Sequence, residues 1–135
     1  MLRLTPSVFL LAALWCSTSL SHAGPVLHCE MTYAGATKTL HVTPVDDPYP
    51  VPSVDVVGRF RFKAVMVGRG AQPDYIKTYA YLETRKQPVL VQQASYYPPF
   101  TPSRQGQRLT GKQFVYAGTA ERELQFECVL HGVQP

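Results

Sequence analysis

The sequence lacks most of the features by which enzymes, membrane proteins and nucleic-acid-binding proteins are recognised. Beyond residue 23, charged residues or prolines interrupt every hydrophobic stretch, so no later segment is long and apolar enough to cross a bilayer. No G-x-S-x-G element is present, and Ser53, Ser95 and Ser103 lie in ordinary strand-end or proline-rich contexts. The net charge of +4 is not gathered into a basic block. We therefore expect a soluble protein that is not an enzyme, needs no cofactor and binds no nucleic acid.

The first 23 residues have the composition of a secretory signal peptide. Arg3 precedes an apolar run over residues 8–15, and small and polar residues follow up to Ala23. This order of charged, apolar and small residues is typical of exported chains, and the apolar run is too short to span a membrane. We expect cleavage after Ala23, a single mature domain over residues 24–135, and a periplasmic or secreted location.

Only two of the three cysteines, Cys29 and Cys128, lie outside this segment. An even pair of cysteines in an exported domain is most simply a disulfide. The sequence thus predicts a covalent link between the two ends of the mature domain.

Alternating hydrophobicity dominates the mature chain, and no segment has a sustained helical period. The pattern predicts strands over residues 26–33, 38–43, 59–67, 75–84, 89–97, 109–117 and 121–131, with strand structure also resuming at residue 54. We expect an all-β fold: a small antiparallel β-sandwich or flattened barrel of about seven strands, closed by the disulfide. It resembles immunoglobulin-like sandwiches in having a cysteine near each end, although the mature chain has no tryptophan to pack on the disulfide.

One hairpin is predicted together with its register. If Val67 pairs with Tyr75, then Phe60 meets Leu82 on the apolar face. The same register aligns cationic side chains with polar or aromatic ones on the other face: Arg59 with Glu83, Arg61 with Tyr81, and Lys63 with Tyr79. A slip of one residue would bury the cations, so we expect this pairing.

A cationic and aromatic surface is the leading candidate for a binding site. Its expected members on the hairpin are Arg59, Arg61, Lys63, Lys77, Tyr79 and Tyr81, and in and beside the two proline-rich loops they are Tyr49, Tyr96, Tyr97 and Phe100. Rigid aromatic side chains give contact area at a low entropy cost, so the sequence favours recognition of a protein or an envelope component there. The alternative is that these cation and aromatic pairs stabilise an exposed sheet face without any ligand.

Metal binding is the second candidate. His28, His41 and His131 are expected to point outward from strands near the ends of the domain, with Glu30 and Glu127 nearby. Imidazole and carboxylate groups bind copper and zinc, although these residues do not have the spacing of a known metal motif. The sequence leaves both candidates open, together with the identity of the partner, the oligomeric state and the strand order.

Overall fold

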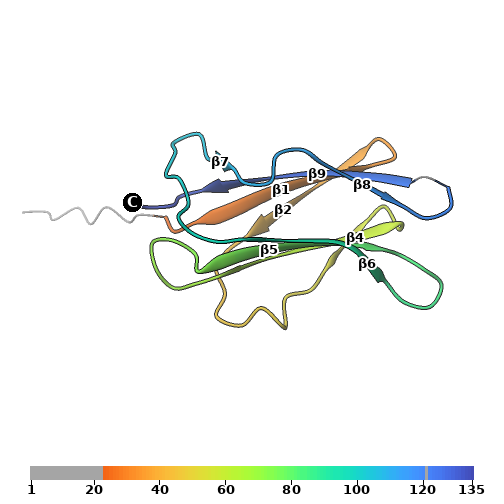
Figure 1. Cartoon of the computed structure of the whole chain (residues 1–135), viewed down its shortest axis with the longest axis horizontal. Coiled ribbons are helices and arrows are strands. Elements are labelled where there is room, and N and C mark those ends of the chain that lie inside the picture. Colours follow the sequence, from red (N-terminus) through yellow and green to blue (C-terminus); the bar gives the residue numbers. More distant parts are fainter. Residues whose placement is uncertain (1–22, 121) are drawn as a thin grey trace, which may run out of the picture.

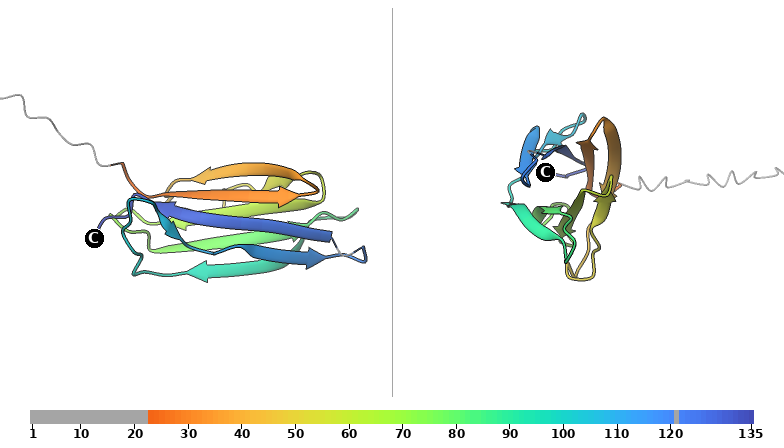
Figure 2. Two further views of the ribbon diagram at one scale, coloured as in Figure 1. Left: turned by 90° about the horizontal axis from the view of Figure 1, so that it is seen from above. Right: turned by 90° about the vertical axis from the view of Figure 1, so that its right-hand side faces the viewer.

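The domain is a sandwich of two antiparallel β-sheets (Figures 1 and 2). The computed structural model describes residues 23–120 and 122–135, so the expected signal segment lies outside the described residues except for Ala23. The terminal sheet contains β1 (Val26–Tyr33), β2 (Ala36–Val42), β7 (Gln107–Arg108), β8 (Gln113–Ala117) and β9 (Arg122–His131). The middle sheet contains β3 (Val54–Val56), β4 (Phe60–Val67), β5 (Tyr75–Leu82) and β6 (Val89–Tyr96). Within the described ranges no helix is long and apolar enough to span a membrane.

The disulfide between Cys29 and Cys128 is present, as predicted, and it joins neighbouring strands of one sheet. The two cysteines are directly opposite each other in the β1–β9 pair, and both are fully buried. In immunoglobulin domains the equivalent bond connects the two sheets. The disulfide of this chain therefore has a different place in the sandwich from that of immunoglobulin domains.

The core lies between the inward faces that the alternation predicted. Leu27 and Met31 of β1 face the interior beside Leu124 and Phe126 of β9, and all four are buried. The middle sheet contributes Phe62, whose ring centroid lies 4.9 Å from that of Phe126. This aromatic contact connects the two sheets at the centre of the sandwich.

The hairpin of β4 and β5 has the predicted register. Phe60 pairs with Leu82, Arg61 with Tyr81, Lys63 with Tyr79, and Val67 with Tyr75. The pairing continues beyond the strands, because the Glu83 amide donates to the Arg59 carbonyl over 2.9 Å. The separation of apolar and cationic residues onto opposite faces was sufficient to determine this register.

The turn between β1 and β2 is tighter than the expected turn over residues 35–37. Tyr33 pairs with Ala36 and Thr32 with Thr37, so only Ala34 and Gly35 connect the strands. Their φ angles of 51° and 78° belong to the left-handed region, which two-residue hairpin turns require at both positions. Alanine seldom adopts this conformation, so the presence of Ala34 gave no sequence signal for a two-residue turn.

The expected strand over residues 109–117 begins only at Gln113, and the short β7 forms over residues 107–108, which were expected to belong to the second proline-rich loop. This extra strand is one reason why the described residues contain nine strands where about seven were expected. β7 and β8 both pair with β9, but residues 109–112 between them leave the ladder. At this point the Thr110 hydroxyl accepts a hydrogen bond from the Cys128 amide over 2.9 Å, in place of a backbone carbonyl. Gly111, with φ 61°, completes the irregular segment.

Candidate functional site

Tyrosines and lysines line the outer face of the middle sheet. Tyr75, Lys77, Tyr79 and Tyr81 alternate along β5, so their side chains lie on the face opposite the core. The rings of Tyr79 and Tyr81 are nearly parallel, with centroids 6.3 Å apart, and Tyr97 approaches Tyr75 with centroids 6.5 Å apart. The face is therefore a row of aromatic rings along a single strand.

Two lysines lie over this row. The ammonium group of Lys63 on β4 is 5.7 Å from the centroid of the Tyr79 ring, and that of Lys77 is 5.3 Å from the centroid of Tyr75. Among residues 23–120 and 122–135, neither lysine forms an ion pair with a carboxylate. Their positive charge is thus available to an anionic group from outside. We call Lys63, Tyr75, Lys77, Tyr79, Tyr81 and Tyr97 the lysine–tyrosine face.

Arg61, by contrast, is occupied within the fold. Its guanidinium group donates to the Ser53 hydroxyl over 2.8 Å, to the Ser53 carbonyl over 2.9 Å and to Glu83 Oε1 over 3.2 Å. The contacts to Ser53 attach the end of the first proline-rich loop to β4. Arg61 therefore positions this loop, and its charge is compensated by Glu83. Arg59 is exposed beside Glu83 at the end of the same face.

The first proline-rich loop lies against β4. The ammonium group of Lys63 donates to the Pro48 carbonyl over 3.3 Å, and Val65, although it points outward, is only 1 % exposed. Val51 and Pro52 line a shallow depression with Val65. The loop therefore covers one end of the outer face, the outward side chains of β5 remain half-buried, and Tyr49 of the loop is 89 % exposed.

Two of the predicted loop aromatics belong to the interior. Phe100 is 3 % exposed and is part of the core, and Tyr96 is half-buried on the inward face, opposite Ile76. Tyr96 hydrogen-bonds to the buried Thr78, but its burial has the larger effect and raises its pKa. These two side chains are therefore not on the predicted surface. The chain passes from the middle sheet to the terminal sheet at this point, and both rings pack in or against the core.

Burial also raises the pKa of Tyr81, and the neighbouring Tyr79 adds to the shift. The Tyr81 hydroxyl, like an ordinary tyrosine hydroxyl, is uncharged at neutral pH and can donate a hydrogen bond. A donor of this kind suits an anionic ligand.

The structure brings two of the three candidate histidines together. His28 and His41 are opposite each other on β1 and β2, with ring centroids 4.5 Å apart, and His28 Nε2 lies 3.8 Å from Glu30 Oε1. His131 instead packs under the backbone of Gly106, where even a Cβ atom would clash with its ring. Over the described ranges no group of three histidine, cysteine or acidic side chains is arranged to hold a metal ion.

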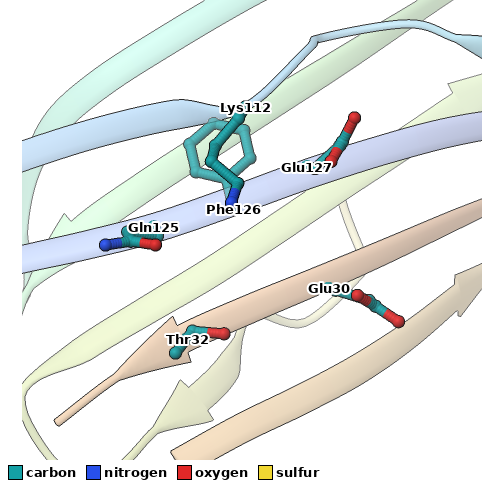
Figure 3. Close-up of a pocket in the computed structure, with 6 residues that line it drawn as sticks. All are labelled: Glu30, Thr32, Lys112, Gln125, Phe126 and Glu127. Carbon is teal, nitrogen blue, oxygen red and sulfur yellow. The ribbon is translucent and has the colours of Figure 1, made fainter. Parts of the chain in front are cut away.

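A small pocket on the terminal sheet contains acidic groups (Figure 3). Glu30 and Glu127 are opposite each other on β1 and β9, and Lys112 lies above Phe126. Arg108 pairs with Glu127 over 2.6 Å and compensates part of the negative charge. The carboxylate groups of Glu30 and Glu127 point away from each other, so they do not form a catalytic pair (Figure 3).

The terminal sheet also contains a coupled pair, Tyr116 and Glu123, opposite each other on β8 and β9. A hydrogen bond from Tyr116 lowers the pKa of Glu123, and Gln125 adds a second, smaller contribution. A lowered folded-state pKa stabilises the fold above the unfolded-state pKa, and this contribution is lost as the pH falls through the folded-state value.

We expect Tyr116→Phe to raise the pKa of Glu123 toward its ordinary value of 4.5. The substitution should therefore reduce stability at neutral pH but not in acid, where the carboxyl is protonated in both proteins. An NMR pH titration of Glu123 measures the pKa directly. Gln125→Ala is the control and should produce a smaller shift in the same direction; equal titration curves for Tyr116→Phe and the unaltered protein would contradict the coupling.

Comparison of the chain with protein-family models, with curated proteins and with solved structures found no match. The function of the chain is therefore inferred from its own geometry. Tyr75, which was not among the site residues expected from the sequence, completes the aromatic row. Its alternation with Lys77, Tyr79 and Tyr81 is the signal that could have identified it.

Proposed function

We propose that this chain is an exported, non-enzymatic binding protein whose lysine–tyrosine face recognises an anionic component of the cell envelope. The observation that supports the proposal is the position of Lys63 and Lys77 over tyrosine rings with no carboxylate partner among the described residues. A cation that is already paired with a carboxylate would attract a further anion only weakly. Export agrees with the N-terminal sequence pattern and with the buried disulfide.

The shape of the face favours an extended ligand whose rings can lie against aromatic side chains. The nearly parallel rings of Tyr79 and Tyr81 present aromatic surfaces along β5, and Tyr97 extends the row beside Tyr75. Aromatic rings pack well against the C–H faces of sugar rings, while lysines and tyrosine hydroxyls pair with carboxylate, sulfate or phosphate groups. An acidic glycan combines both kinds of group, so it is the class of ligand that we assign to this face.

The predicted alternative, in which the same contacts only stabilise the sheet, accounts for part of the arrangement. Cation and aromatic pairs at exposed sites contribute about 0.5–1 kcal/mol each, so Lys63 and Lys77 also support the fold. A purely stabilising role does not explain why the two lysines have no carboxylate partner among the described residues, whereas the charge of Arg61 is compensated by Glu83. Metal binding has less structural support, because the described residues bring only His28 and His41 together.

The test is calorimetric titration of the protein with heparin, a sulfated glycan, at low and high salt. The double substitution Lys77→Gln and Tyr79→Thr removes one cation and one ring from the face. We expect it to weaken binding about tenfold, equivalent to roughly 1.4 kcal/mol. Binding should also weaken with salt, because the attraction between exposed charges is screened.

The matched control is Lys112→Gln with Tyr116→Thr, which removes the same two kinds of group from the opposite sheet. This control variant should bind heparin like the unaltered protein. Uncharged dextran should bind neither to the control variant nor to the unaltered protein. Equal loss of affinity in both double variants, or binding that salt does not change, would show that the lysine–tyrosine face is not the site.

A further inference from the structure

The exposed edge of the middle sheet has the properties of a self-association site. β6 is the last strand of that sheet and has a neighbour on one side only, β5. Its backbone therefore presents unpaired N–H and C=O groups along the other side, which can pair with a further strand. Figure 2 shows β6 along one long side of the domain, next to β8 of the other sheet.

β6 lacks most of the devices by which proteins protect such edges. Its sequence, VLVQQASY, has no charged residue and no proline. The other edges are shorter or charged: β3 has three residues, β7 has two including Arg108, β8 has five, and β2 contains Lys38. Charged residues and short strands normally prevent edge-to-edge pairing, so β6 is the one long edge among the described strands that is open to it.

Exposed apolar side chains are concentrated on β6 and on β8, its neighbour in the other sheet. Six of the eight exposed large hydrophobic residues among those described belong to β6, to the residue after it, or to β8: Val89, Leu90, Val91, Tyr97, Phe114 and Tyr116. Exposed apolar groups that cluster in this way mark association surfaces more often than scattered ones.

We propose that two copies of this chain pair through β6, antiparallel about a two-fold axis. The properties of the strand identify the occupant: β6 can pair with itself without bringing charged side chains of the strand together, and this pairing covers exposed apolar groups of both copies. In the antiparallel arrangement Arg85 and Lys86, which precede β6, lie at opposite ends of the paired strands. The cations of the two copies are thereby kept apart.

The β-bulge in β6 determines the most extensive register. The strand has an extra residue, Val91, where the pairing with β5 shifts between Ala80 and Tyr81, so the regular edge is residues 92–96. This segment overlaps itself most fully about Ala94, and Gln93 of one copy then faces Ser95 of the other. Val91 lies opposite Tyr97 of the second copy, so exposed apolar groups cover each other.

Pairing of this kind joins the two middle sheets into one continuous sheet of eight strands. Antiparallel neighbours in a sheet are related by an axis perpendicular to it, so both lysine–tyrosine faces lie on the same side. Two binding surfaces on one face raise the affinity for a long ligand through the high effective concentration of the second site. This consequence depends on the proposed function, whereas the pairing itself does not.

The test measures the mass of the full chain by sedimentation over micromolar to millimolar concentrations. Gln93→Lys with Ser95→Lys places introduced lysines opposite each other in the dimer, and since like charges directly opposite destabilise strand pairs, we expect the dimer dissociation constant to rise about tenfold or more. The matched control, Gln93→Lys with Ser95→Glu, places opposite charges there and should keep the dimer. Thermal melting confirms that both variants fold.

A second measurement locates the contact. A nitroxide label on Gln93→Cys should give an intermolecular distance within about 20 Å, because paired strands lie only about 5 Å apart. A protein that remains monomeric at every concentration, or a dimer with a long distance that both double variants retain, would overturn the proposal. If the unaltered protein forms the dimer but does not bind heparin, the result would count against the proposed function alone.

Discussion

Removing the disulfide is expected to lower the free energy of unfolding by about 4–5 kcal/mol, since the bond closes a loop of about 100 residues. Cys29 and Cys128 are separated by 99 positions, so the bond restricts nearly the whole unfolded domain. The total stability of a small domain is about 5–15 kcal/mol. The double substitution Cys29→Ala and Cys128→Ala should therefore bring the protein close to unfolding at 37 °C.

Urea unfolding followed by circular dichroism measures this effect. Ser95→Ala is the control, because it replaces an exposed small side chain of the same domain and should leave the stability unchanged. The two substitutions should also increase the slope of the unfolding free energy with urea, since the unfolded chain without the bond is more expanded. A loss of less than about 1 kcal/mol would show that the cross-link contributes little beyond the packing of β1 on β9.

Phe62→Ala should produce the second large effect, a loss of about 3–5 kcal/mol. Phe62 is fully buried, and its ring contacts Phe126 across the interface between the sheets, with centroids 4.9 Å apart. The substitution removes apolar area from the core and leaves a cavity that the two sheets cannot fully close. Urea unfolding should give a lower midpoint with the same slope.

Phe114→Ala is the matched control, because it removes the same side chain from an exposed position on β8. We expect its effect to stay within about 0.5 kcal/mol. If both substitutions cost the same, the contact between Phe62 and Phe126 would not be the centre of the core.

Much of the fold follows from patterns along the chain. The β4–β5 register could be predicted because its two faces differ in charge, so only one alignment keeps Arg61 and Lys63 out of the core. The disulfide could be predicted because Cys29 and Cys128 are the only two cysteines beyond the expected signal segment. The tight turn at Ala34 could not, since alanine gives no sign of a left-handed conformation.

The candidate site could be predicted only in part. Alternation places Tyr79 and Tyr81 on the outer face, because strand geometry alone decides this. No local pattern shows that Arg61 binds Ser53 and Glu83, since these contacts depend on how the first proline-rich loop folds back over β4. The charge of Arg61 is compensated for that reason, and the lysines, not the arginine, carry the proposal.

The sequence by itself determined the all-β class, the inward and outward faces of the main strands and the cysteine pair, because each depends on the alternation or composition of nearby residues. Only the tertiary structure decided which strands are neighbours, that Phe100 enters the core, that the His131 ring packs against Gly106, and that β6 has a neighbour on one side only. These features depend on how two sheets pack and where the chain crosses between them. Contacts of that kind join residues far apart in the sequence, so no local pattern encodes them.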